Sequence, residues 1–143
     1  MISSCDTMSQ ENRILSHNDL PTTVNKLKTI IQKKGLTHFS TIDHQANAEG
    51  VGLDLLPESL VIFGNPKAGT TLMKCNPAIG LELPLRILIQ TNDQDETIIH
   101  TSNLMSWQRK YNINQKRCLE ILMKTQKTMD EIIRDITEDV FDT

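Results

Sequence analysis

The stretch from Leu60 to Thr71, LVIFGNPKAGTT, decides the fold expected for this chain. Residues 60–63 form a continuous apolar run, and a glycine, Gly64, follows it directly. A short apolar run bounded by turn-forming residues is typical of a strand that is buried on both faces. The residues from Thr70 to Cys75 then favour one or two helical turns. The sequence thus predicts an interior strand that bends sharply into a short helix.

The segments before this stretch predict one long helix and several short elements. Apolar residues recur at helical spacing between Val24 and Ile31 and predict a helix over residues 21–34. Pro21 suits the first turn of this helix, and Gly35 suits a left-handed backbone at its end. The same reasoning predicts three more elements: a short edge strand at 13–15, a strand at 36–44 and a short helix at 47–51.

The segment after the stretch predicts a hairpin. Leu85, Ile87 and Ile89 occupy every second position, which indicates a strand with one more deeply buried face. Residues 92–95, NDQD, have the chemistry of a turn, and a returning strand is expected from residue 98 onward. The hairpin and the two earlier strands together predict a sheet of four or five strands.

The last third of the chain predicts a long helix over residues 114–140. Apolar residues recur there at steps of three and four, from Leu119 to Val140. Such a stripe fits a helix laid across the sheet, the interpretation we favour, or a seam between two helices of a dimer. The predicted fold is mixed α/β, with a small sheet covered by the first and last helices. The core is expected to include Leu27, Ile31, Ile87, Leu122, Met129 and Ile133.

Composition and charge argue against nucleic-acid binding. The chain has 143 residues, 38% of them hydrophobic and 23% charged, which is enough for one folded domain. Its net charge is −3, and no segment is dense in the Lys and Arg that neutralise phosphates. Three Phe, one Tyr and one Trp leave little for base stacking. We expect a single domain over residues 12–140, preceded by a disordered or frayed segment over residues 1–11.

Cysteine and histidine placement indicates no metal site and no disulfide framework. Cys5, Cys75 and Cys118 lie far apart and form no CxxC pair, and the four histidines are scattered. Free thiols fit a reducing cytoplasm. No run approaches the roughly 20 apolar residues of a membrane span, and the first residues lack the features of a signal peptide. We therefore expect a cytoplasmic protein with no membrane segment, no metal ion and no cofactor.

The two glycines after the apolar run mimic a phosphate-binding loop. Four residues separate Gly64 from Gly69, as in a P-loop, but Thr70 stands where that motif needs Lys. Pro66 also removes a backbone N–H donor from the cradle. Two interpretations stay open, which are anion binding at the N-terminus of the following helix and a tight turn shaped by the glycines. The tentative ligand-binding residues are Gly64, Asn65, Lys67, Gly69, Thr70 and His44.

The segment FGNPKAGT, residues 63–70, carries a resemblance to a known family. Together with Asn76–Pro77 and the LPLR segment at 83–86, it resembles the bacterial domain-of-unknown-function family numbered 302. The resemblance covers about residues 12–138. It implies a compact α/β domain that commonly pairs as a dimer, with no activity, substrate or cofactor established for the class. The chain departs from the family at residues 99–102, IHTS, where relatives tend to have an aromatic residue and then a proline.

Two groups of side chains are candidates for chemistry. Asp43 and His44, at a strand end, could act as an acid–base pair, although neighbouring residues on a strand point to opposite faces. Cys75 could be a nucleophile if His44 or His100 lay beside it. The resemblance places Cys75 where relatives usually have a small residue, which favours a packing role. We assign no catalytic residue.

The leading functional hypothesis is a non-catalytic module that binds a small ligand, an anion or a partner, as a homodimer. One alternative is an enzyme that uses Asp43, His44, Lys67 or Cys75. Another is an interaction domain that acts through the outer face of residues 114–140.

Overall fold

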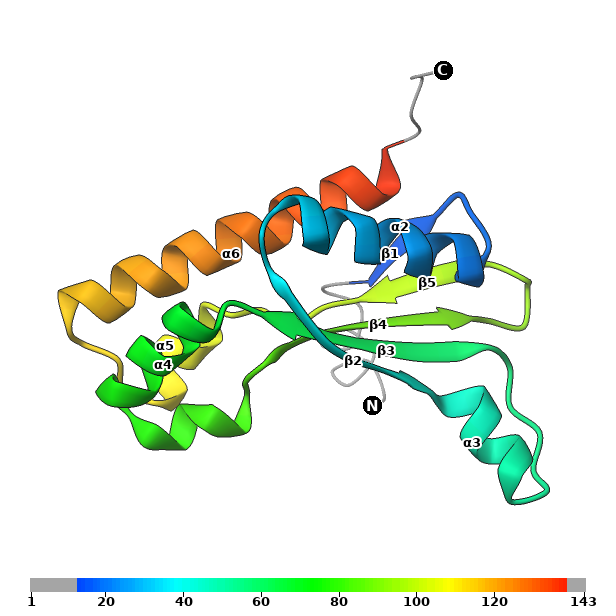
Figure 1. The fold of residues 1–143 in the computed structure, drawn as a ribbon, viewed down its shortest axis with the longest axis horizontal. Helices are drawn as coiled ribbons and strands as arrows, with labels where there is room; N and C mark the ends of the chain where they lie inside the picture. Colours follow the sequence, from blue (N-terminus) through cyan, green and yellow to red (C-terminus); the bar gives the residue numbers. More distant parts are fainter. Residues whose placement is uncertain (1–12, 139–143) are drawn as a thin grey trace, which may run out of the picture.

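Five strands form one antiparallel sheet in the order β1-β5-β4-β3-β2 in a computed structural model that describes residues 13–138 (Figure 1). The predicted frayed segment over residues 1–11 lies outside the described residues. The mixed α/β fold is confirmed. The strands are β1 (Arg13–Ser16), β2 (Thr37–Asp43), β3 (Glu58–Gly64), β4 (Leu85–Thr91) and β5 (Thr97–His100). The helices are α2 (Leu20–Lys33), α3 (His44–Gly50), α4 (Pro66–Cys75), the 3-10 helix η1 (Pro77–Leu81), α5 (Ser106–Lys110) and α6 (Lys116–Thr137).

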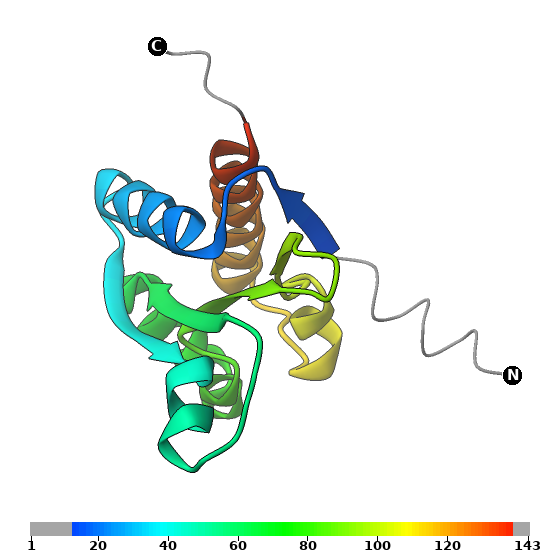
Figure 2. The same ribbon diagram turned by 90° about the vertical axis from the view of Figure 1, so that its right-hand side faces the viewer.

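The helices α2 and α6 cover one face of the sheet (Figures 1 and 2). In β3 only alternate side chains, those of Ser59, Val61 and Phe63, are buried beneath them, and Leu60 and Ile62 are half-buried on the other face. The expectation of a strand buried on both faces is therefore wrong. An antiparallel sheet with helices on one side has a fully buried face and a more open one.

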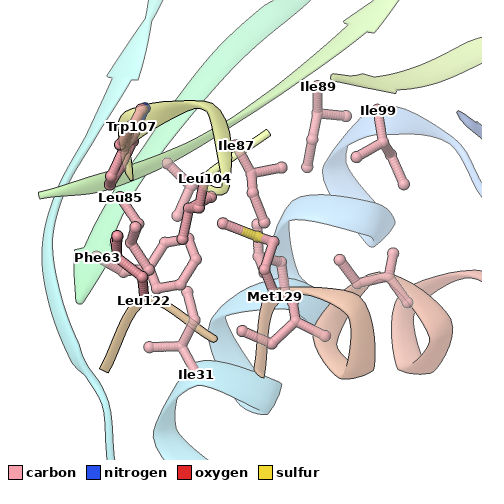
Figure 3. Close-up of a cluster of buried hydrophobic side chains, with 14 of the residues drawn as sticks. Ile31, Phe63, Leu85, Ile87, Ile89, Ile99, Leu104, Trp107, Leu122 and Met129 are labelled. Carbon is pink, nitrogen blue, oxygen red and sulfur yellow. The ribbon is translucent and has the colours of Figure 1, made fainter. Parts of the chain in front are cut away.

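The core lies between the sheet and these two helices (Figure 3). Five of the six predicted core residues, those at positions 27, 31, 87, 122 and 129, are buried. The sixth, Ile133, is only partly buried, and Ile132 takes the fully buried position instead. The long helix thus packs on the domain's own core, as favoured from the sequence. Its buried residues are Cys118, Leu122, Met129, Ile132 and Ile136.

Side-chain caps explain why two helices begin earlier than predicted. Oδ1 of Asn65 accepts hydrogen bonds from the N–H groups of Lys67 and Ala68, at 3.0 and 3.2 Å, and α4 therefore starts at Pro66 instead of residue 70. Oδ1 of Asp43 likewise accepts from the N–H of Ala46 at 2.9 Å, so α3 starts at residue 44 instead of 47. Short polar side chains that fold back onto the next turn start both helices.

A polar cluster ties η1 to α5. The carboxylate of Glu82 accepts hydrogen bonds from the Tyr111 hydroxyl and from Nζ of Lys110. These bonds, the one from Tyr111 above all, lower the pKa of Glu82 below its ordinary value of 4.5. Because the folded-state pKa is lowered, the stabilisation is complete above pH 4.5 and is lost as the pH falls through the folded-state value.

We expect Glu82→Gln to lower the free energy of unfolding at about pH 7, since the amide accepts weaker bonds than the carboxylate. The difference in the free energy of unfolding between variant and wild type should become smaller below the ordinary pKa of 4.5. Urea unfolding at a series of pH values measures this difference. A gap that stays constant down to about pH 3 would show that the carboxylate charge contributes nothing.

No helix within residues 13–138 combines the length and the apolar character needed to cross a membrane.

Candidate functional site

A groove of about 570 Å³ lies between α4 and α6, at the end of β3 that carries Gly64. Its volume is in the range of small-molecule sites. One wall is formed by residues 66–73 of α4, and the opposite wall by the N-terminal half of α6. The segment from Leu83 to Leu85 and the start of β2 close the ends. From α6 the lining residues are Arg117, Ile121, Lys124, Thr125 and Thr128.

Large apolar side chains are exposed in this groove. Phe39 is 49% exposed and Met73 is 37% exposed, although both belong to types that usually lie in the core. Leu83 and Ile121 line the same space and are half-buried. The groove therefore offers apolar surface that a ligand could remove from water.

Three cations line the groove, and no carboxylate does. Lys67 comes from α4, and Arg117 and Lys124 come from α6, so positive charge stands on both walls. None of the ion pairs formed within residues 13–138 involves these three side chains. An anion placed between the walls would meet unpaired positive charge from both sides.

The backbone at the start of α4 does not provide the anion cradle considered from the sequence. Pro66 has no N–H, and the N–H groups of Lys67 and Ala68 already donate to Asn65. The N–H of Gly69 donates to the Asn65 carbonyl at 2.9 Å. The first turn is thus satisfied internally, and an anion in the groove depends on the side chains of the cations.

The glycines do not form the tight turn that was the other interpretation. Gly64 ends β3 and Gly69 lies inside α4, whereas the described glycines with positive φ are Gly35, at +71°, and Gly52, at +79°. The turn between strand and helix consists of Asn65 alone. Gly35 confirms the predicted left-handed helix end.

The structure brings five of the six tentative ligand residues together and leaves one apart. Gly64, Asn65, Lys67, Gly69 and Thr70 all line the groove. His44 does not, because Thr37 of β2 pairs with Gly64 and Asp43 pairs with Ser59. His44 therefore follows the far end of a seven-residue strand. The two ends lie about 20 Å apart at about 3.3 Å per residue.

A second groove, of about 480 Å³, lies at that far end and is acidic. Within the described part of the chain, no group of three or more His, Cys, Asp or Glu side chains is placed to hold a metal ion. The charge of its lining is opposite to that of the first groove. Its acidic lining residues are Asp19, Asp43, Glu58, Asp93 and Asp95.

Cys75 and Cys118 form a disulfide bond, which corrects the expectation of free thiols at both positions. The bond joins the last residue of α4 to the first turn of α6, so it links the two helices that wall the groove. Sequence spacing gave no sign of this pair because 43 positions separate the two cysteines and only the packing of α4 on α6 brings them together.

The side chains considered for catalysis are not gathered at one place. Asp43 caps α3 and lines the acidic groove, Lys67 lines the cationic groove, and Cys75 is held in the disulfide. His100 is hydrogen-bonded to Gln90 on the sheet, where burial, and next the nearby charge of Arg13, lower its pKa. No acid–base or nucleophile–base pair results from these placements.

Sequence reasoning missed the contribution of α6 to the groove. Arg117, Ile121, Lys124 and Thr128 are spaced by four, three and four residues, so they form one stripe along the helix. This stripe of cationic and apolar residues runs beside the buried stripe of α6. Its spacing could have predicted a second functional face of the helix. Phe39 and Leu83 were also missed as groove residues, since a single apolar residue in a mostly polar strand or beside a proline carries no periodic signal.

A sheet covered by helices on one face, with a cationic and partly apolar groove at its edge, defines a small mixed α/β domain. The family model described as "Domain of unknown function DUF302" matches residues 12–136, and the chain belongs to this family. The crystal structure of an uncharacterized conserved DUF302 protein from Bacillus stearothermophilus has the same fold, with a TM-score of 0.72. The two chains are 16% identical, and the match covers 88% of this chain and 96% of the other.

Curated relatives are similar over part of their length. "Fluoride-specific ion channel FluC 1" of Brucella suis biovar 1 is 40% identical over 73 residues, which are 51% of this chain and 29% of that protein. "Fluoride-specific ion channel FluC 2" of Brucella melitensis biotype 1 is also 40% identical over 73 residues, 27% of its length. The match thus spans less than a third of the length of either relative.

Proposed function

We propose that this domain is a non-catalytic binding module whose groove between α4 and α6 takes a small amphipathic anion. The observation that carries the proposal is the lining, which combines exposed apolar side chains with three cations and no carboxylate. A ligand with an apolar body and one anionic group satisfies both halves of this lining.

The energetics favour such a ligand over a purely apolar or purely charged one. Burial of apolar surface against Phe39 and Met73 contributes about 25 cal/mol per Å² removed from water. Hydrogen bonds from charged groups add about 1.5–3 kcal/mol each. The side chains of Lys67, Arg117 and Lys124 are exposed, so folding does not desolvate these cations and they stay free to bind an anion.

Neither alternative function gains support from the geometry. The enzyme hypothesis needs two of Asp43, His44, Lys67 and Cys75 to act together in one pocket. Asp43, Lys67 and Cys75 lie in the acidic groove, the cationic groove and the disulfide, and the Asp43 carboxylate accepts its hydrogen bond from the backbone of Ala46 and not from His44. The interaction hypothesis relies on the outer face of residues 114–140, and the five side chains that α6 buries in the core lie on its opposite face, so their burial does not support it.

Pairing as a homodimer and a cytoplasmic location are parts of the proposal that rest on the sequence. The expectation of a cytoplasmic location was based in part on free thiols, which are typical of a reducing compartment. Because Cys75 and Cys118 are bonded, that part of the argument no longer applies. The partial matches to longer relatives support a modular role, because a stretch of 73 residues, 51% of this chain, is similar to part of larger proteins.

Isothermal titration calorimetry with three probes tests the proposed ligand class. Dodecanoate has the chain and the negative charge, dodecyltrimethylammonium has the chain with a positive charge, and acetate has the charge alone. We expect measurable binding of dodecanoate only, together with a raised melting temperature. Equal binding of the two long-chain probes, or no binding of dodecanoate, would contradict the proposal.

A further inference from the structure

The disulfide lies where it can control the groove. Cys75 is the last residue of α4, and Cys118 lies in the first turn of α6. Both helices wall the groove, and Arg117, one of its three cations, is the chain neighbour of Cys118. A change in this bond therefore acts directly on the relative position of the two walls.

Few fully buried side chains fix α4. Leu72 is its one buried residue, whereas α6 buries five. A short helix with so little apolar burial is weakly held by packing, since tertiary burial supplies most helix stability in proteins. The bond to Cys118 thus adds a covalent anchor at the C-terminal end of α4, beside the contacts of this helix with η1 and α6.

Both redox forms of the pair can be accommodated. Sγ of Cys75 lies 3.1 Å from Oε1 of Gln115, and Sγ of Cys118 lies 3.5 Å from the carbonyl oxygen of Thr71. After reduction each thiol therefore has an oxygen within reach that can accept its weak S–H hydrogen bond. Cys118 is 1% exposed, so its S–H group would be buried after reduction. The carbonyl oxygen of Thr71 can accept its hydrogen bond, so the buried donor does not remain unsatisfied.

The half-buried Cys75 is the point of attack for an external thiol, because its partner sulfur is shielded. We propose that Cys75–Cys118 is a reversible thiol–disulfide exchange site that sets the affinity of the groove for its anionic ligand. This inference rests on the proposed function, because the exchange would regulate the proposed binding of the anionic ligand.

The exchange partner is a dithiol. One thiolate of the dithiol attacks Sγ of Cys75, the bond to Cys118 breaks, and the sulfur of Cys118 leaves as a thiolate that takes up a proton. The second thiol of the reagent then displaces Cys75 and closes its own disulfide. Two electrons and two protons pass to the protein, and the reagent is oxidised. Release of the C-terminal end of α4 then moves this wall of the groove away from Arg117 and Lys124 on α6.

Titration of dodecanoate into the oxidised and the dithiothreitol-reduced protein tests this regulation. We expect about tenfold weaker binding after reduction, within the usual range of coupling between sites. Reoxidation should restore the affinity. A C75S/C118S variant should match the reduced protein and ignore the reductant, and C5S should keep the full response as the matched cysteine control.

Hydrogen exchange without ligand separates this inference from the proposed function. Reduction should raise exchange in residues 66–75 and leave the strands unchanged, even if dodecanoate is the wrong probe. Absence of dodecanoate binding, with that redox-dependent exchange still present, would overturn the proposed function alone. Equal dodecanoate affinity and equal hydrogen exchange in the two redox forms would overturn the proposed redox control. Three free thiols per chain after mild oxidation would overturn it as well, because the disulfide would then not form.

Discussion

Reversal of two cations, Arg117→Glu with Lys124→Glu, is expected to weaken dodecanoate binding by about 100-fold. Each cation that bonds the carboxylate contributes about 1.5–3 kcal/mol, so the two together contribute at least about 3 kcal/mol, which corresponds to a factor of about 100 or more. Both side chains are exposed and have no ion-pair partner within residues 13–138, so the folded state should tolerate the change. Calorimetric titration measures the affinity, and circular dichroism checks the fold.

The matched control for this double variant is Arg13→Glu with Lys33→Glu. It changes the net charge by the same amount, at exposed positions on β1 and α2 outside the groove. Its dodecanoate affinity should stay within about threefold of wild type, because distant charges are screened by salt. If both double variants lost affinity equally, the effect would come from overall charge and the groove would not be the binding site.

The substitution Phe63→Ala is expected to lower the free energy of unfolding by about 4 kcal/mol, because it empties a large fully buried site. Phe63 is 0% exposed and lies in the central cluster with Leu122 and Met129 (Figure 3). Urea denaturation followed by circular dichroism measures the loss. A cost below about 1 kcal/mol would mean that the core at this end of β3 is loosely packed.

Phe39→Ala is the same change at a half-exposed position and serves as its control. We expect it to cost less than about 1 kcal/mol of stability, as surface substitutions usually do. It should weaken dodecanoate binding instead, since Phe39 contributes apolar surface to the groove. The two variants thus separate packing from ligand contact.

Most elements of the fold were predictable because periodicity and turn chemistry are local. The alternation of Leu85, Ile87 and Ile89 follows from the two-residue period of a strand with one buried face. Helix starts were misplaced where a side chain supplies the cap, as at Asn65, because the cap bond depends on backbone geometry that composition does not report. The helices η1 and α5 are too short to show a period.

The candidate site was predictable only in part, because its walls come from distant segments. The local stretch around Gly64 and Lys67 was recognised from its unusual glycines and its position after a strand. Arg117 and Lys124 join it through the packing of α6 beside α4, a contact that no local pattern encodes. The partnership of Cys75 with Cys118 depends on the same packing and was missed for the same reason.

The most direct test of the groove as an amphipathic anion site is a crystal structure with dodecanoate that carries bromine on its terminal carbon. We expect an anomalous bromine peak near the apolar residues Phe39, Leu83 and Ile121, with the carboxylate within hydrogen-bond reach of Lys67, Arg117 or Lys124. A bromine peak at another surface, with the groove filled by water alone, would contradict this assignment.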